Sequence, residues 1–540
     1  MDRREFLEAS TLLTGGALLR GVPDSGRADS APAPSATPSV LAASLWQPAP
    51  RMIGIQAGAV SFVDEGTERV LDAFQELAAI NTIFLATFTY GRGIAGRQLP
   101  SQPLPDHGKQ QYDVDTFHGG NYATPHPQYY RNTALVPEKA PDHPGYDVLT
   151  DVLPAAHKRG MRVICWFEDV LKYSAAIAAP GFERAQEVVL SGPASDFACT
   201  RNPNTRNFWL GLVEDYLRSY DVDGLMWGSE RQGPLGNVLG ANHGGVAAGG
   251  RLACFCQYCL AEAKTRGIDV DRAKTGYLQL AAWASALRAG QTFEDGAFVT
   301  FWRLLVKFPE ILAWERLWND ALNDTYRDMY RLAHEIAPAK GTGWHVWHNN
   351  SFSPFYRAEQ DYGDYAQYSD FLKVVMYNLC GGERLAQYVR STARSIFADL
   401  TPDQVLEFTY DVQRYHDQPL DRLPAAGLGA DYVLRETRRA VAGVGPKLRV
   451  WPGIDVDIPT GAASKKTTPD DVYQAVHAAF AGGAHGVLLS RKYSEMRLDN
   501  LRGAGRAIRE RTGDGVSVMT GPAGASAAKP AIGGAIEWRR

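Results

Sequence analysis

Short runs of β-branched and aromatic residues alternate with longer amphipathic stretches between Arg51 and Glu510. Eight of these runs have the length of a strand, and at least one stretch with helical spacing of apolar residues separates each from the next. They lie at 52–57, 82–88, 162–167, 224–227, 343–347, 372–377, 448–454 and 486–489. Eight strands that alternate with helices predict an α/β fold, a closed parallel (β/α)8 TIM barrel.

Several helical stretches lie where such a barrel needs them, at Glu68–Ala79, Asp147–Arg159, Thr205–Ser219 and Glu315–Ala337. The last repeat starts with the helix signal Thr468-Pro469-Asp470 and continues through a Gly-Gly stop into a buried strand. This repeat would close the barrel. An open doubly wound sheet is the alternative, but no GxGxxG motif follows the first run.

The predicted connections differ in length, with long loops at about 89–145, 168–204, 229–314 and 378–446. Each of them starts after a strand. In a TIM barrel that is the end where active sites lie, and loops of this length in a compact domain are usually functional. We therefore expect the site on these long βα loops.

The two ends of the chain differ in composition from the barrel segment, 51–512. Residues 1–21 combine Arg3-Arg4 with a short, modestly apolar stretch and resemble a twin-arginine signal peptide, which predicts export to the periplasm or the cell exterior. A frayed amphipathic N-terminus is the alternative. The Ala-, Pro- and Ser-rich segment 22–50 predicts a disordered linker, and 513–540 a C-terminal tail.

Composition narrows the classes of partner. The chain has 540 residues, of which 45% are hydrophobic, and a net charge of -4 without a long basic run, so nucleic acid is not an expected partner. The apolar stretch near the N-terminus is too short for a membrane span. The 12 Trp and 24 Tyr residues are numerous, and such rings either fill a large core or stack on sugars.

Glu230 is the strongest candidate for a catalytic residue. It follows the buried run 224–227 after Gly228 and Ser229 and so lies at the carboxyl end of the fourth predicted strand. Hydrolysis of a glycosidic bond needs one carboxyl group to protonate the leaving oxygen and another to attack carbon or activate water. The alternative is that Glu230 forms a loop ion pair with the adjacent Arg231 or another basic group.

Several other strand ends carry acids that could be the second carboxylate. Asp455 at the end of the seventh strand is our first choice, and Asp457 shares its face by the two-residue period of a strand. Glu168 ends the third strand, and Glu383 follows the sixth. An acid at such a position can instead cap the next helix, particularly Asp457, which precedes Pro459.

Aromatic and polar side chains at the strand ends are expected to bind the sugar, because flat rings stack on it and His or Asn both donate and accept hydrogen bonds. Arg491 would hold a carboxylate ionised or bind an acidic substrate, or else pair with Glu495. The predicted substrate contacts are Trp166, Glu168, Trp227, Arg231, His345, Trp347, Asn349, Tyr377, Trp451, Asp457 and Arg491.

Three cysteines fall within six residues, Cys254, Cys256 and Cys259, and Cys199 lies upstream. Three thiols so close together do not all pair locally, whereas a tetrahedral Zn²⁺ accepts four sulfurs. We therefore predict a structural zinc site with no coordination position open for water, and no organic cofactor. One disulfide with free thiols is the alternative, which an exported protein permits.

The central part of the chain resembles glycoside hydrolase family 42 and related barrels. The resemblance rests on Cys199-Thr-Arg-Asn-Pro, the strand 223–230, the cysteine cluster and Phe301-Trp302, about a fifth of the chain. It implies a (β/α)8 barrel, an acid/base glutamate at the position of Glu230, a nucleophile at the end of the seventh strand and a four-cysteine zinc site.

Three features depart from that family. Ser229 stands where the family has Asn, Asp455 or Asp457 stands where it has a nucleophilic glutamate, and 23 residues separate Glu230 from Cys254. The resulting hypothesis is a hydrolase of O-glycosidic bonds in an oligosaccharide or glycoside. A non-catalytic carbohydrate-binding barrel and a barrel lyase or isomerase acting on sugars are the alternatives.

Overall fold

The computed structural model describes residues 44–49, 51–98, 104–109, 117–244 and 251–512. All of them belong to one compact unit, Ala42–Arg540. The predicted signal peptide, most of the predicted linker and the predicted C-terminal tail lie outside the described residues and stay predictions.

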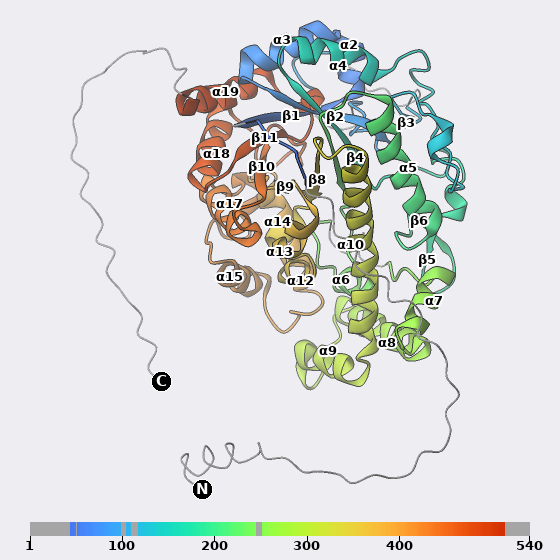
Figure 1. The fold of residues 1–540 in the computed structure, drawn as a ribbon. Coiled ribbons are helices and arrows are strands. Elements are labelled where there is room, and N and C mark those ends of the chain that lie inside the picture. The colour runs from blue at the N-terminus through green and yellow to red at the C-terminus, as the bar shows by residue number, and fades with distance from the viewer. Residues whose placement is uncertain (1–43, 50, 99–103, 110–116, 245–250, 513–540) are drawn as a thin grey trace, which may run out of the picture. The chain divides into compact units, whose positions relative to one another are not determined.

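Eight parallel strands form a closed barrel at the centre of this unit (Figure 1). β1 pairs with β2 on one side and with β11 on the other, which closes the sheet. The predicted (β/α)8 barrel is confirmed. In chain order the parallel strands are β1 (Met52–Gly58), β2 (Thr82–Thr89), β4 (Arg162–Glu168), β7 (Gly224–Gly228), β8 (Gly341–Val346), β9 (Phe371–Val375), β10 (Arg449–Asp455) and β11 (Gly486–Ser490).

Helices cover the outside of the barrel, and the predicted ones are present with ends shifted by a few residues. Local chemistry explains where two of them begin. Asp147 accepts the amides of Leu149 and Thr150, and Thr468 forms a capping box with Asp471. The helices that alternate with the strands are α2 (Ala59–Glu65), α3 (Thr67–Ala78), α4 (Val148–Lys158), α5 (Pro203–Ser219), α10 (Glu310–Ile336), α13 (Tyr362–Tyr365), α17 (Ala430–Val444), α18 (Pro469–Ala481) and α19 (Leu498–Thr512).

The long connections are as long as expected, but two of those predicted as loops, 229–314 and 378–446, are largely helical. In the first of these connections, α8 (Val270–Arg288) packs against α9 (Gly296–Lys307) and α10 (Figure 1). The inserted elements are β3 (Gly120–Asn121), β5 (Gln186–Val188), β6 (Ala194–Ala198), α6 (Pro234–Leu239), α7 (Gln257–Thr265), α8 (Val270–Arg288), α9 (Gly296–Lys307), α11 (Asn349–Phe352), α12 (Pro354–Glu359), α14 (Gly381–Thr392), α15 (Pro402–Gln413) and α16 (Leu423–Ala426), with short 3-10 turns at Pro127–Tyr129, Phe182–Arg184, Ala366–Tyr368 and Tyr493–Glu495.

The hydrophobic core has two layers. A large one fills the space between the barrel and its helices. A smaller one is formed by Met52, Phe84, Ala86, Ile164, Trp166, Met226, Phe371, Trp451 and Leu488. Its members come from seven of the eight strands, as expected for side chains that fill the inside of a barrel.

The folded part of the chain begins before Arg51, which corrects the predicted linker boundary. Trp46 packs on the small core, with its ring centre 5.7 Å from that of Phe371 and 5.8 Å from that of Trp451. A Cβ atom at Gly341 would lie 2.6 Å from the Trp46 ring, so this close packing requires glycine there. The composition of 22–50 predicts disorder, but Trp46 within this segment packs on the barrel core.

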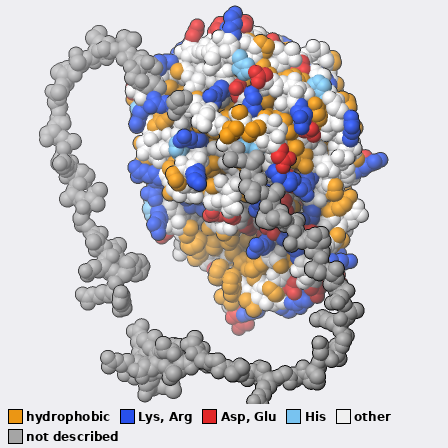
Figure 2. All heavy atoms as spheres, in the orientation of Figure 1, with side chains coloured by type: hydrophobic (Ala, Val, Ile, Leu, Met, Phe, Trp, Pro, Cys, Tyr) orange, Lys and Arg blue, Asp and Glu red, His pale blue; other side chains and the backbone are white. Residues whose placement is uncertain are grey.

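Hydrophobic side chains also gather on the surface over α9 at the lower end of the view in Figure 2. Phe298, Val299, Trp302 and Val306 are between 49% and 69% exposed. Across the described residues, no helix has both the length and the apolar character needed to cross a membrane.

Replacing Trp46 tests whether this residue is part of the fold. Trp46→Ala is expected to lower the free energy of unfolding by about 2–4 kcal/mol, because it removes packing from the end of the barrel core. Leu45→Ala is the matched control, since Leu45 is 64% exposed, and it should change stability by less than about 0.5 kcal/mol. Urea denaturation measures the free energy of unfolding of both variants. Equal losses would show that the packing of Trp46 on the barrel core does not stabilise the fold.

Candidate active site

Glu168 and Glu230 lie side by side at the carboxyl end of the barrel. Glu168 is the last residue of β4 and is in register with Gly228 of β7. Glu230 lies two residues beyond Gly228, and His345 of β8 is in register with Gly228 from the other side. Because neighbouring strands are only about 4.8 Å apart, three polar groups meet here.

A chain of hydrogen bonds runs from Glu230 into the barrel. The Glu230 carboxylate contacts Nε2 of His345 at 2.9 Å, and Nδ1 of His345 contacts Nζ of Lys373 at 3.0 Å. Lys373, in β9, also donates to the hydroxyl of Tyr377 at 2.7 Å. Lys373 is fully buried, whereas 42% of the Glu230 side chain is exposed, so the chain of contacts ends at the accessible carboxylate.

Lys373 determines how His345 contacts Glu230. The ammonium form of Lys373 donates to Nδ1 of His345, which leaves Nε2–H to donate to Glu230. Burial lowers the pKa of Lys373 to about 7, against the raising effect of Glu168 and Glu230.

The environment of Glu230 favours its ionised form. Neighbouring atoms remove part of the hydration of the carboxylate, which acts to raise its pKa even though the side chain is 42% exposed. The hydrogen bond and charge of His345 oppose this, together with the charges of His243 and Arg384, and lower the pKa to about 2. Glu230 is therefore a carboxylate at neutral pH.

Glu168 is shifted in the opposite direction. It is only 9% exposed, and burial raises its pKa. The positive charge of His345 lowers the pKa, the negative charge of Glu230 raises it, and Lys373 and the Trp166 hydrogen bond lower it, with a net increase. Nε1 of Trp166 donates to one Glu168 oxygen at 3.0 Å, which orients the carboxyl group.

Arg231 does not pair with Glu230. Its guanidinium is buried and lies 2.7 Å from Asp169 and 2.5 Å from Glu187 of β5. Arg251 contacts Glu187 from the other side at 3.2 Å. This arrangement corrects two predictions, because Arg231 is neither the ion-pair partner of Glu230 nor placed to contact a sugar. It anchors the loop after β7 to the β5–β6 hairpin.

Asp455 and Asp457 are engaged by the protein itself. Asp455 is 1% exposed, and its two oxygens accept the backbone amides of Cys380 at 2.8 Å and Ile458 at 3.1 Å. Asp457 accepts from the amide of Arg497 and the side chain of Asn500 at the start of α19. Neither residue caps the next helix, α18, whose N-cap is Thr468, and neither contact set includes Glu230.

Three of the four tryptophans expected to stack on sugar, Trp166, Trp227 and Trp451, are part of the core, which corrects their assignment. Trp227 is 0% exposed and packs on Tyr326 of α10, with ring centres 4.9 Å apart. Trp451 is 1% exposed and stacks on Phe371 inside the barrel. Both rings lack an accessible face for a sugar.

The other predicted contacts divide by their surroundings. Trp166 is buried and supports Glu168, while Trp347, 8% exposed, lies 5.4 Å from the His243 ring. Asn349 is fully buried and donates to Gln232 and Ala241, which makes it a structural residue rather than a sugar contact. Tyr377 contacts Lys373. Arg491 pairs with Glu495 at 2.5 Å, which is the ion pair expected as the alternative to a role in substrate binding.

Sequence reasoning missed Lys373, Arg384 and His348. Lys373 did carry a signal, because a lysine in the middle of the apolar strand Phe371–Val375 is buried only where it has partners. Arg384, in the first turns of α14, carried none. It reaches the site because its NH1 donates to Nδ1 of His348 at 3.0 Å, a contact between segments 36 residues apart.

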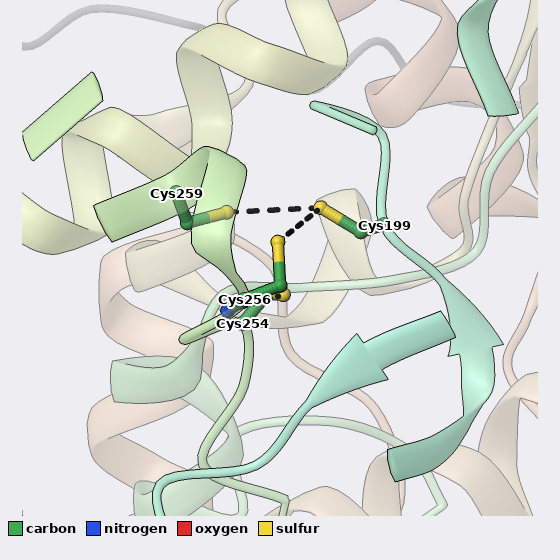
Figure 3. Close-up of side chains that lie close together, drawn as sticks. All are labelled: Cys199, Cys254, Cys256 and Cys259. Atoms are coloured by element: carbon green, nitrogen blue, oxygen red, sulfur yellow. Dashed lines mark hydrogen bonds between the residues drawn. The ribbon is translucent and has the colours of Figure 1, made fainter. Parts of the chain in front are cut away.

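The four clustered cysteines converge on one point from different elements (Figure 3). Cys199 follows β6, Cys254 and Cys256 precede α7, and Cys259 lies in its first turn. All four are buried, and their sulfur atoms lie within 4.8 Å of one another. The Sγ atom of Cys199 is 3.6 Å from that of Cys256 and 3.7 Å from that of Cys259, so these are separate thiols.

One family model matches the chain. Residues 125–228 match Glycosyl hydrolase-like 10, and this segment includes β4, Glu168 and β7 and ends two residues before Glu230. A comparison with curated proteins found no sequence match. The segment that carries one of the two neighbouring carboxylates is thus glycosyl hydrolase-like.

Solved structures with a similar fold include three glycosidases. A β-galactosidase from the psychrophilic Marinomonas ef1 is 12% identical, with a TM-score of 0.47 over 86% of this chain and 60% of that one. The cold-adapted β-galactosidase from Rahnella sp. R3 is 13% identical, with a TM-score of 0.46 over 88% and 57%. α-L-Fucosidase isoenzyme 2 from Paenibacillus thiaminolyticus is 12% identical, with a TM-score of 0.42 over 86% and 50%. The chain therefore spans between 50% and 60% of the length of these three proteins.

Proposed function

We propose that the protein hydrolyses O-glycosidic bonds, with Glu168 as the general acid and Glu230 as the ionised carboxylate. The observation that carries this proposal is the opposite shift of two neighbouring carboxyl pKa values, raised for Glu168 and lowered for Glu230. Glycosidases need such a difference, because one group must hold a proton while the other has lost it. The glycosyl hydrolase-like match over Glu168 supports the same class.

In this mechanism Glu168 gives its proton to the glycosidic oxygen as the bond to the anomeric carbon breaks. Glu230 either attacks that carbon, with water later releasing the sugar, or takes a proton from the water that attacks it. Water is consumed, its hydroxyl remains on the anomeric carbon, and the leaving alcohol keeps the proton of Glu168. His345 and Lys373 position Glu230 and maintain its charge.

This assignment differs from the pair suggested by the resemblance to family 42. There the partner of the fourth-strand acid ends the seventh strand, where this chain has Asp455 with both oxygens occupied by backbone amides. Glu168, at the end of the third strand, accepts a hydrogen bond from Trp166, and the charge of Glu230 raises its pKa. We therefore favour Glu168 over Asp455.

Lys373 supports a second candidate function, a lyase or isomerase acting on sugars. A buried lysine with a pKa of about 7 has a substantial neutral fraction at neutral pH, and a neutral amine can condense with a sugar carbonyl to an imine and water. The hydrogen bonds of Lys373 to His345 and Tyr377 suit a positioning role better. A non-catalytic binding barrel accounts less well for two carboxyl groups with opposite shifts.

We also propose a structural zinc ion bound by Cys199, Cys254, Cys256 and Cys259. In a tetrahedral site with Zn–S bonds of about 2.3 Å, sulfur atoms lie about 3.8 Å apart, close to the 3.6 and 3.7 Å found here. The amides of Val188 and Cys256 both point to Sγ of Cys254 at 3.4 Å, a contact that stabilises a thiolate. The ion would hold α7 against the β5–β6 hairpin.

Export by the twin-arginine route is part of the proposal as well. Its support is the Arg3-Arg4 pair and the short apolar stretch that follows it.

Neutralising either carboxylate tests the proposed function. Glu230→Gln is expected to lower kcat/KM by about 10³-fold or more, and Glu168→Gln by about 10²–10⁴-fold, with little change in melting temperature. A panel of chromogenic glycosides identifies a cleaved substrate and measures both losses. Full activity in either variant would contradict the assignment.

Asp455→Asn is the matched control at the same end of the barrel. It should cost about 1 kcal/mol of stability, because one backbone amide loses its acceptor, but reduce kcat/KM by less than about tenfold. A larger loss of activity with unchanged stability would instead favour Asp455 as the partner of Glu230.

The pH dependence of kcat/KM provides an independent test. Activity requires ionised Glu230 and protonated Glu168, so it should fall as pH drops through the pKa of Glu230 and as pH rises through the raised pKa of Glu168. His345→Ala removes the group that lowers the pKa of Glu230, so the acid limb should move from about 2 toward the ordinary value of 4.5. An acid limb that stays in place would show that His345 does not control Glu230.

Metal analysis of the purified protein tests the zinc site. We expect about one zinc per chain, lost in Cys256→Ser together with part of the thermal stability. Cys165→Ser is the control, because Cys165 is also buried but lies outside the cluster, and it should retain the metal. Metal-free protein that is as stable as the metal-containing form would rule out a structural zinc.

A further inference from the structure

Arg384 carries a positive charge at the proposed active site but forms no ion pair there among the described residues. Its side chain is half-buried, NH1 donates to Nδ1 of His348, and the guanidinium carbon lies 5.7 Å from the centre of the Tyr377 ring. Its charge also acts on Glu230. Within the part of the chain that the structure describes, Arg384 has no carboxylate within 4.0 Å.

The contact with His348 fixes the guanidinium without neutralising it. His348 is fully buried, and burial lowers its pKa well below 6.5, with the charge of Arg384 acting in the same direction. The ring is therefore neutral, with Nδ1 as an acceptor for Arg384 and Nε2 facing the hydroxyl of Tyr432 at 3.1 Å. One N–H of Arg384 is used in this way, which leaves further donors of the fork for another group.

Two nearby cations have a carboxylate partner, which Arg384 lacks. Arg491 and Lys492 both lie 2.5 Å from Glu495, whereas Lys373, like Arg384, contacts a histidine nitrogen. Glu230 is itself held by His345, whose hydrogen bond and charge lower the pKa of Glu230 more than the charge of Arg384 does. Stabilising Glu230 is thus not a sufficient account of Arg384.

We propose that the substrate is an acidic saccharide and that Arg384 binds its anionic group, an inference that rests on the proposed glycosidase function. A preorganised guanidinium fork matches two oxygens of a carboxylate or a sulfate, with short charge-assisted hydrogen bonds. A uronic acid residue supplies the first group and a sulfated sugar the second. Either would compensate the charge that the protein leaves unpaired.

Binding to the wild-type protein tests this without requiring turnover. Isothermal titration would compare uronic acids and sugar 6-sulfates with the corresponding neutral sugars, glucose and galactose. We expect at least one acidic sugar to bind about tenfold or more tightly than its neutral counterpart, because hydrogen bonds to charged groups are the stronger ones. Whether the uronate or the sulfate is preferred identifies the anionic group.

Variants at position 384 identify the residue that recognises the anion. Arg384→Gln should abolish the preference for the acidic sugar, and Arg384→Lys should restore part of it. Arg390→Gln is the control, because Arg390 is an exposed arginine of the same helix, and it should behave like wild type. Melting temperatures would verify that all variants fold.

The outcomes separate this inference from the proposed function. Equal binding of acidic and neutral sugars, no binding of any sugar in the panel, or an acidic preference that survives Arg384→Gln would overturn the inference. Cleavage of neutral aryl glycosides as efficient as that of aryl uronides and sulfated glycosides would overturn it too and leave the hydrolase proposal standing. Conversely, Arg384-dependent binding of acidic sugars without cleavage of any glycoside would support anion recognition and contradict hydrolysis.

Discussion

The pairing of β1 with both β2 and β11 closes the barrel, and the arrangement of the site depends on that closure. All eight strands are parallel, so their carboxyl ends meet at one end of the barrel. Residues from positions as distant as 168, 230, 345 and 373 then face one another across adjacent strands. The four strands concerned, β4, β7, β8 and β9, are consecutive neighbours in the sheet, and closure curves them around a common axis.

Closure places two carboxyl groups in one site, and their different neighbours shift the two pKa values in opposite directions. Lys373 is buried among apolar strand residues and contacts His345, whose hydrogen bond and charge lower the pKa of Glu230 and keep it ionised. Glu168 is buried without a comparable ion pair and retains its proton more strongly. The chemical difference between two glutamates thus comes from their neighbours, since their intrinsic acidities are equal.

A second buried network connects the cysteine cluster to the same loop. Arg231 directly follows Glu230 in the chain and is held by Asp169 and by Glu187 of the β5–β6 hairpin. Cys199 lies at the end of this hairpin, and the amide of Val188 contacts Sγ of Cys254. Removing one partner from a buried ion pair is costly, because the other charge is left without compensation. The ion pairs of Arg231, one residue beyond Glu230 in the chain, therefore hold the Glu230 loop against the hairpin that leads to Cys199.

The sequence by itself determined the barrel, the strand that carries Glu230 and the grouping of four cysteines. The strands follow from local periodicity, and Cys254, Cys256 and Cys259 from their short spacing, whereas Cys199 was added from 55 residues before Cys254. The sequence also revealed Asp455 and the tryptophans as strand-end residues. Residue type alone, however, does not distinguish a carboxylate that binds backbone amides from one that faces a substrate. Nor does it distinguish a ring in the core from a ring at the surface. Only the tertiary structure decided that Glu168 neighbours Glu230, that Trp46 packs on the barrel core and that Arg384 reaches the site from α14. Those facts depend on contacts between residues far apart in the chain, and burial and charge at such contacts set the chemistry.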